Sequence, residues 1–135
     1  MGIMHSSRAE VYIHLVWSTW DRHPFLTDRV RPRVFNCIRS ECARMKADVV
    51  ALGGVEDHVH VLIRVPATLS ISSIVKQIKG SSSHLANAGE DTFKLQGGCA
   101  AFSVSRGLLA RARDYVLNQE ERHRAGKLVR DFEPP

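Results

Sequence analysis

The sequence has no long hydrophobic run, and this absence excludes several classes of protein. Its longest apolar segments, such as residues 49–52, are far shorter than the roughly 20 residues that a membrane-spanning helix needs. The first ten residues, MGIMHSSRAE, lack the apolar stretch of a secretory signal, and Gly2 alone does not indicate lipidation. We therefore expect a cytoplasmic protein with no membrane partner.

Cysteine is also scarce. The three cysteines, Cys37, Cys42 and Cys99, are odd in number and form no CxxC pair. This argues against a disulfide framework or a cysteine-based metal site and favours three reduced, mostly buried thiols. The chain also has no internal repeat and no low-complexity segment.

What the chain does contain is ordinary globular composition with a positive balance. Its 135 residues are 44% apolar and 24% charged, which predicts one soluble domain with one core. We take that domain as residues 1–135, with 1–8 and 126–135 loosely ordered. Nineteen Lys and Arg against fourteen Asp and Glu give a net charge of +5, a weak indication of a polyanionic partner.

The hydrophobic pattern predicts seven elements in the order β-α-β-β-α-β-α. Strands are expected at 10–19, 48–55, 58–65 and 100–105, and helices after a Thr27 or Asp28 cap, after a Ser70 cap and over 108–124. Residues 86–98 are expected to be a loop. The first six elements are the split β-α-β arrangement of an α+β ferredoxin-like domain, with an antiparallel sheet and helices on one face. The last helix is an addition to that fold.

The segment 57–62, DHVHVL, predicts a paired-histidine site. Residues two apart on a strand point to the same side, so His58 and His60 project together while Val59 and Val61 face the core. Both imidazoles could then reach one cation on the open face of the sheet. The alternative is two surface histidines with no shared role. His14, on the neighbouring first strand, is expected to be a packed, hydrogen-bonded histidine, with a place flanking the site as the alternative.

A second pair lies on the last predicted helix. Tyr115 and Gln119 are four residues apart, so in a helix they share one face. Taken alone, an ordinary amphipathic helix explains them. Together with His58 and His60, however, they suggest an open site for Mg²⁺ or Mn²⁺ bound jointly with a substrate phosphate. Tyrosine has an ordinary pKa of about 10, and a nearby cation would favour the phenolate that attacks phosphorus.

The whole pattern resembles the single-tyrosine HUH transposases, which include the REP-associated tyrosine transposases. The resembling stretches follow the family order and cover nearly the whole chain. They are YIHLVWST at 12–19, ALGGVEDHVHVLIRVP at 51–66, LSISSIVKQIKGSSSHL at 69–85, FSVS at 102–105 and DYVLNQEERH at 114–123.

The resemblance implies a metal-dependent transposase that cleaves and rejoins single-stranded DNA through a 5′-phosphotyrosine. It implies that Tyr115 is the nucleophile and that His58, His60 and Gln119 hold the metal. It also implies a homodimer acting on hairpin-bearing DNA ends. The chain departs from its relatives at 95–99, LQGGC, where they commonly carry aromatic residues, and at Arg122, where a second histidine often stands.

Five basic residues are candidate DNA contacts, although each also fits a solvated surface. They are Lys76, Lys79, Arg22, Arg64 and Arg106. The alternative function is a non-catalytic, domesticated module that binds DNA hairpins on the same fold. A small metal or ligand sensor is a further rival, but it leaves the charge and the Tyr115–Gln119 spacing unexplained. An RNA-recognition module is disfavoured, because histidines stand where its central strands would carry aromatics.

Overall fold

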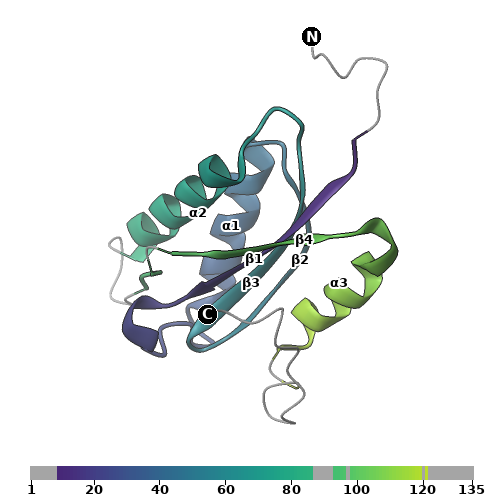
Figure 1. Cartoon of the computed structure of the whole chain (residues 1–135). Helices are drawn as coiled ribbons and strands as arrows, with labels where there is room; N and C mark the ends of the chain where they lie inside the picture. The colour runs from purple at the N-terminus through teal and green to yellow at the C-terminus, as the bar shows by residue number, and fades with distance from the viewer. Residues whose placement is uncertain (1–8, 87–92, 97, 120, 122–135) are drawn as a thin grey trace.

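The computed structural model describes residues 9–86, 93–96, 98–119 and 121, and it shows the predicted order of elements (Figure 1). The elements are β1 (Val11–Ser18), η1 (Trp20–Arg22), α1 (Arg31–Arg44), β2 (Asp48–Val55), β3 (His58–Val65), α2 (Ile71–Ala86), β4 (Ala100–Val104), η2 (Arg106–Leu108) and α3 (Leu109–Leu117). Within the described residues no helix is both long and apolar enough to cross a bilayer.

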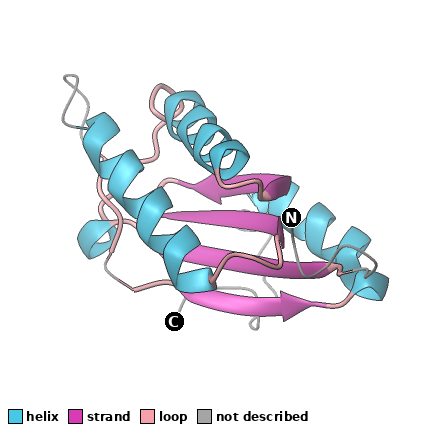
Figure 2. Cartoon of the chain, turned by 90° about the horizontal axis from the view of Figure 1, so that it is seen from above, coloured by secondary structure: helices cyan, strands magenta, loops and turns pink. Residues whose placement is uncertain are grey.

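The four strands form one sheet in the order β2-β3-β1-β4, and every neighbouring pair is antiparallel. Figure 2 shows the strands side by side with helices flanking them. β2 and β3 are joined by the two-residue turn Glu56–Asp57, so the predicted hairpin is confirmed. The predicted α+β fold with an antiparallel sheet and an added C-terminal helix is confirmed as well.

The two faces of the sheet pack against different helices because the strand side chains alternate. Leu15, Trp17, Val59 and Val61 are fully buried in the larger core, beneath α1 and α2. The opposite face carries a smaller apolar cluster in which Leu62 meets residues of α3. The histidines lie on this second face, and α3 therefore decides their surroundings.

The start of α1 and the end of α3 differ from the sequence prediction, whereas one predicted cap is confirmed. α1 begins at Arg31 rather than beside Thr27, because residues 28–30 form a turn in which the Thr27 hydroxyl accepts the Val30 N–H at 3.2 Å. α3 ends at Leu117, since Asn118 leaves helical geometry (φ −107°, ψ 31°); the predicted end at 124 lies outside the described residues. The Ser70 cap is confirmed, because its hydroxyl accepts the Ser73 N–H at 3.1 Å.

The segment expected as a loop contributes to the core. Phe93 and Leu95 are buried, and Leu95 pairs with Thr19 as an isolated bridge. Residues 87–92 of that expected loop lie outside the described residues. The segment 93–96 thus extends the sheet beyond the end of β1, close to the turn that carries Arg22.

A buried carboxylate joins α1 to α2. The side chain of Glu41 is only 9% exposed and accepts hydrogen bonds from Gln77 Nε2 at 2.6 Å and from Arg44 at 3.1 and 3.3 Å. The hydrogen bond from Gln77 is the main cause that holds the pKa of Glu41 below its ordinary value, with Arg44 adding to the effect. This contact therefore stabilises the fold only while Glu41 is ionised.

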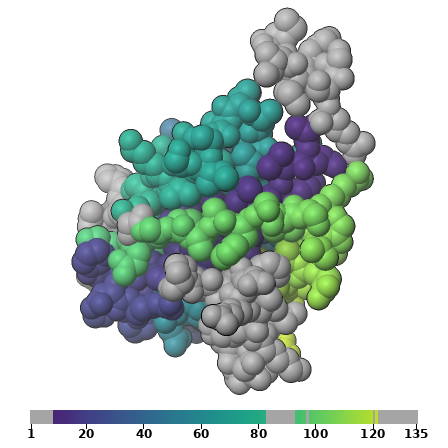
Figure 3. All heavy atoms as spheres, viewed as in Figure 1, coloured from purple at the N-terminus to yellow at the C-terminus, as the bar shows by residue number. Residues whose placement is uncertain are grey.

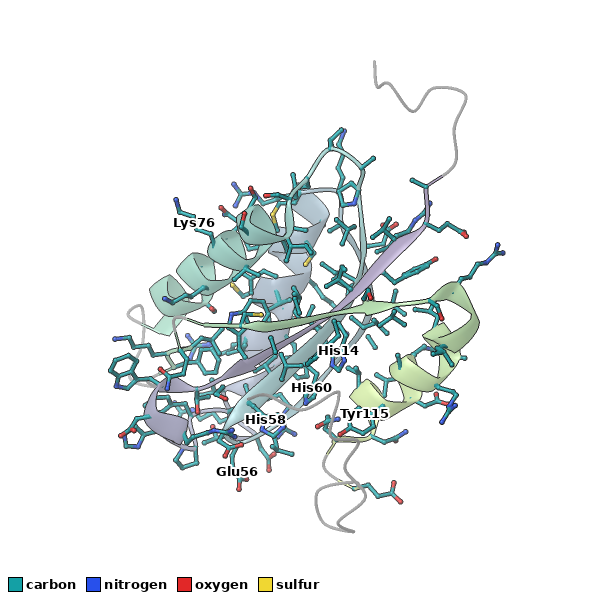
Figure 4. All side chains as sticks on the ribbon, in the orientation of Figure 1. His14, Glu56, His58, His60, Lys76 and Tyr115 are labelled. Carbon is teal, nitrogen blue, oxygen red and sulfur yellow. The ribbon has the colours of Figure 1, made fainter. Side chains whose placement is uncertain are left out.

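We expect Glu41→Gln to lower the free energy of unfolding at pH 7 by about 1–3 kcal/mol, the range for hydrogen bonds to a charged group. Because the folded-state pKa is depressed, the contribution is complete above the ordinary glutamate pKa and disappears as the pH falls through the folded value. Denaturant unfolding at neutral and acid pH measures this. Exposed Glu56, which projects away from the fold in Figure 4, supplies the control Glu56→Gln. An equal loss at both pH values would contradict the assignment.

Candidate active site

Three histidines lie together on the face of the sheet opposite α1 and α2 (Figure 4). His58 and His60 come from β3 and His14 from β1, and all three are at most 2% exposed. The ring centroids of His58 and His60 are 5.1 Å apart, and His14 stacks on His60 at 4.9 Å. The prediction that His58 and His60 share one face is confirmed, and His14 packs beside them as expected.

α3 brings Tyr115 to this cluster from the same chain. The Tyr115 ring lies edge-on to His60 with 6.0 Å between centroids, and the residue is 2% exposed. A glycine allows this approach, because a Cβ at Gly53 would lie 1.8 Å from the carbonyl oxygen of Val116. Gly53 is the sheet partner of His60, so α3 crosses the sheet next to His60 and places Tyr115 over it.

Gln119 lies just beyond the end of α3, four residues after Tyr115. Its Nε2 donates a hydrogen bond to the Tyr115 carbonyl at 2.9 Å, and the residue is 1% exposed. Its Oε1 is buried and accepts no hydrogen bond from any described residue. A buried amide oxygen without a donor is uncommon and costs stability, so it marks a position where a cation or another donor would fit.

The hydrogen bonds of the two β3 histidines define which nitrogen can bind a metal. His58 Nδ1 lies 2.8 Å from Asp57 Oδ1. Since a carboxylate only accepts, Nδ1 of a neutral His58 carries the proton and Nε2 keeps the lone pair. His60 Nδ1 lies 2.7 Å from His14 Nε2, so its inner nitrogen is likewise engaged. Metal-bound histidines in proteins typically have this second partner.

Asp57 is itself held firmly in place. Its backbone carbonyl accepts hydrogen bonds from the Thr19 N–H at 2.8 Å and from the Thr19 hydroxyl at 3.1 Å. Its second carboxylate oxygen lies 3.6 Å from the Arg22 guanidinium. Arg22, a half-exposed cation on a neighbouring turn, therefore contacts Asp57, and Asp57 in turn orients the His58 imidazole.

His58, His60 and Gln119 could together hold a divalent ion. Two neutral imidazoles and one amide oxygen would form an incomplete set with room for phosphate oxygens. No group of three His, Cys, Asp or Glu side chains in the described part of the chain is arranged to hold a metal. Gln119 lies outside those residue types, so this finding does not bear on a site made of two histidines and an amide.

The cysteines take no part in this chemistry. Burial raises the pKa of Cys42 to about 11 and that of Cys99 to about 12, and burial also raises the pKa of Cys37. All three stay neutral thiols at pH 7, and thiolate is the nucleophilic form. All three are free, as the spacing predicted.

The five basic candidates are spread over the molecule, and only Arg22 adjoins the histidines. Lys76 and Lys79 lie on α2, and Figure 4 shows Lys76 across the sheet from the cluster. Arg64 donates to the Ala9 carbonyl at 3.0 Å, six residues along β3 from His58, or about 20 Å. Arg106 pairs with Glu10 at 3.3 Å. Contact with DNA stays a prediction for all five.

For Asp57, the sequence predicts a turn residue by default, with orientation of a histidine as the alternative. The sequence does not identify Gly53, which lies within a strand, as a contributor to the site. A glycine inside a strand is nonetheless a known signal of close backbone approach. Which backbone approaches it depends on tertiary packing.

The comparisons with known proteins agree with this fold. The profile of the family described as "Transposase IS200 like" matches residues 7–119. A candidate transposase from Deinococcus radiodurans has a solved structure that is 25% identical, with a TM-score of 0.67 over 88% of this chain and 98% of that one. A comparison with curated proteins gives no match.

A second solved structure is that of a REP-associated tyrosine transposase bound to a REP hairpin. It is 16% identical, with a TM-score of 0.63 over 88% of this chain and 70% of that one, and this likeness shows the fold alone. The fold and the matched profile together define the chain as a transposase of the single-tyrosine HUH class. It belongs to the IS200-like transposase family.

Proposed function

We propose that this transposase cleaves and rejoins single-stranded DNA with Tyr115 as nucleophile and with a divalent ion held by His58, His60 and Gln119. One observation carries the proposal. His58 and His60 meet Tyr115, from a distant segment, in one buried cluster, and Gln119, whose amide oxygen has no donor among the described residues, is hydrogen-bonded to the Tyr115 carbonyl. Packing alone does not favour burying these polar groups together.

The proposed reaction is a transesterification. The Tyr115 oxygen attacks phosphorus and forms a 5′-phosphotyrosine bond, while the bond from phosphorus to the 3′ oxygen breaks. The phenol loses a proton and the departing 3′ oxygen gains one. A bound divalent ion would polarise a phosphate oxygen and neutralise developing charge. Attack by a 3′ hydroxyl on the phosphotyrosine reverses these changes and rejoins the strand, since the ester conserves the bond energy.

The DNA partner is proposed from the family and from the chain's charge. The REP-associated relative is described as bound to a REP hairpin, and we extend hairpin-bearing DNA ends to this chain as substrate. A net charge of +5 is compatible with such a polyanion. A homodimer is part of the same proposal.

The test is incubation of the purified protein with labelled single-stranded hairpin DNAs in Mg²⁺, in Mn²⁺ and in EDTA, followed by a denaturing gel. We expect a covalent protein–DNA adduct with either metal and none with EDTA. Tight binding without an adduct on any DNA would instead support a non-catalytic hairpin-binding module. Adduct formation in EDTA would overturn the metal assignment.

A further prediction concerns the carboxylate beside His58. Asp57→Asn should weaken Mn²⁺ binding about 10- to 100-fold, because the neutral amide no longer fixes the protonated Nδ1. His60→Ala should remove binding almost entirely. Calorimetric titration with Mn²⁺ measures both without DNA. Asp28, whose side chain is 98% exposed, provides the control Asp28→Asn. Unchanged Mn²⁺ affinity in His60→Ala would show that the ion binds elsewhere.

A further inference from the structure

A cavity lies on the sheet face that carries the histidines, one strand away from them. Its volume is about 330 Å³, and Val16 and Ala100 line it. Val16 pairs with His60 on one side and with Ala100 on the other, so the three residues form one row across the sheet. Neighbouring strands are about 4.8 Å apart, which places the cavity directly beside the proposed metal site.

The walls of this cavity combine apolar side chains with hydrogen-bonding groups. The lining includes Val16, Ala100, Cys99, Ser18, Gln96 and Arg22. Gln96 is held in position because its N–H donates to the Ser18 carbonyl at 2.9 Å. The Cys99 thiol stays neutral at pH 7, since burial raises its pKa to about 12. No carboxylate lines the cavity among the described residues.

The turn that supplies Arg22 has an unusual backbone. Asp21 and Arg22 both have positive φ, 52° and 56°, and neither is glycine. Each such residue is unfavourable by about 1 kcal/mol or more. The resulting turn directs the Arg22 guanidinium to Asp57 and leaves the side chain 48% exposed at the cavity. Strain of this kind is concentrated at functional sites.

We propose that this cavity, lined by Val16, Ala100, Ser18 and Gln96, seats one unpaired nucleobase of the DNA strand next to the cleaved phosphate. The base packs on the Val16–Ala100 surface, while Gln96 and Ser18 hydrogen-bond to its edge and Arg22 contacts the adjoining phosphate. A base offers apolar faces and a polar edge, which matches this lining. The inference rests on the proposed function and adds a determinant of which strand position is cleaved.

The matched variants are neighbours on β4. Ala100→Phe fills the cavity, whereas Ala101→Phe adds the same bulk on the opposite, exposed face of the strand. Figure 3 shows β4 as a green band at the molecular surface, and Ala101 on it is exposed. Neither residue belongs to the proposed catalytic cluster.

The experiment measures covalent adduct formation on a strand that the wild type cleaves, with single abasic sites placed at each position around the cleavage point. For the wild type we expect one abasic position next to that point to reduce the adduct about 5- to 100-fold, the worth of one stacked base. With Ala100→Phe, adduct formation on the intact strand should fall by the same factor. It should recover when that same position is abasic. Ala101→Phe should behave as the wild type.

Ala100→Phe activity that equals wild type on the intact strand, or a loss that no abasic position restores, would overturn the inference while leaving the proposed function in place. If the wild type forms no adduct on any DNA, the proposed function fails, and a titration with the four deoxynucleoside 5′-monophosphates decides the cavity alone. Shifts of the Ala100 methyl and Gln96 amide NMR signals would support the seat. Their absence with all four nucleotides would overturn it.

Discussion

Tyr115→Phe is expected to abolish the covalent protein–DNA adduct and to leave DNA binding and folding nearly unchanged. The substitution removes one oxygen from a ring that is already buried beside His60. A phenyl ring of almost the same volume keeps the packing between α3 and the sheet. The phenylalanine ring, however, has no oxygen that could attack phosphorus. The loss should therefore be complete rather than partial.

The chain provides its own control for this variant. Tyr12, the second of only two tyrosines, lies partly buried near the far end of β1 on the same face of the sheet. Tyr12→Phe should keep full adduct formation. The two variants are compared on denaturing gels for the adduct and by fluorescence anisotropy for DNA binding. An adduct that persists in Tyr115→Phe and disappears in Tyr12→Phe would show that Tyr12, and not Tyr115, is the nucleophile.

Gly53→Ala should damage both stability and catalysis, although it adds only one methyl group. That methyl carbon would meet the backbone oxygen of Val116 at 1.8 Å, and a backbone atom cannot move aside alone. α3 must shift away from the sheet, which should lower the free energy of unfolding by about 1–3 kcal/mol or more. Because Tyr115 adjoins Val116, the nucleophile moves with it. Adduct formation should fall far more than the melting temperature alone explains.

Gly80→Ala is the matched control for this result. Gly80 lies within α2, and an added Cβ would have no atom within 4 Å. There the same chemical change should stabilise the protein by about 0.5–1 kcal/mol, because alanine favours the helix. Thermal unfolding and adduct formation are measured for both variants. A harmless Gly53→Ala would mean that α3 does not pack on the sheet as described.

Much of the site could be predicted from local sequence because it depends on the two short periodicities of strands and helices. On β3, His58 and His60 are two residues apart, which in any strand places them on one side. The boundary errors have local causes as well. Thr27 caps a turn rather than α1, and Asn118 leaves helical geometry after Leu117.

Other features of the site could not be predicted from such local patterns. The contact between His14 and His60 spans 46 residues and depends on β1 pairing with β3 in one register. Arg22 reaches Asp57 only because two left-handed residues turn the chain after β1. The cavity beside Val16 exists because Gln96, from the segment expected as a loop, continues the sheet edge.

The sequence by itself determined the order of elements, the shared face of the histidines and the family to which the motifs point. These depend on alternation, helical spacing and residue type, all of which act over a few positions. The tertiary structure alone decided that Tyr115 lies over His60 of its own chain, because the helix can approach only where Gly53 leaves room. Close packing between distant segments depends on volumes and registers that no local pattern contains.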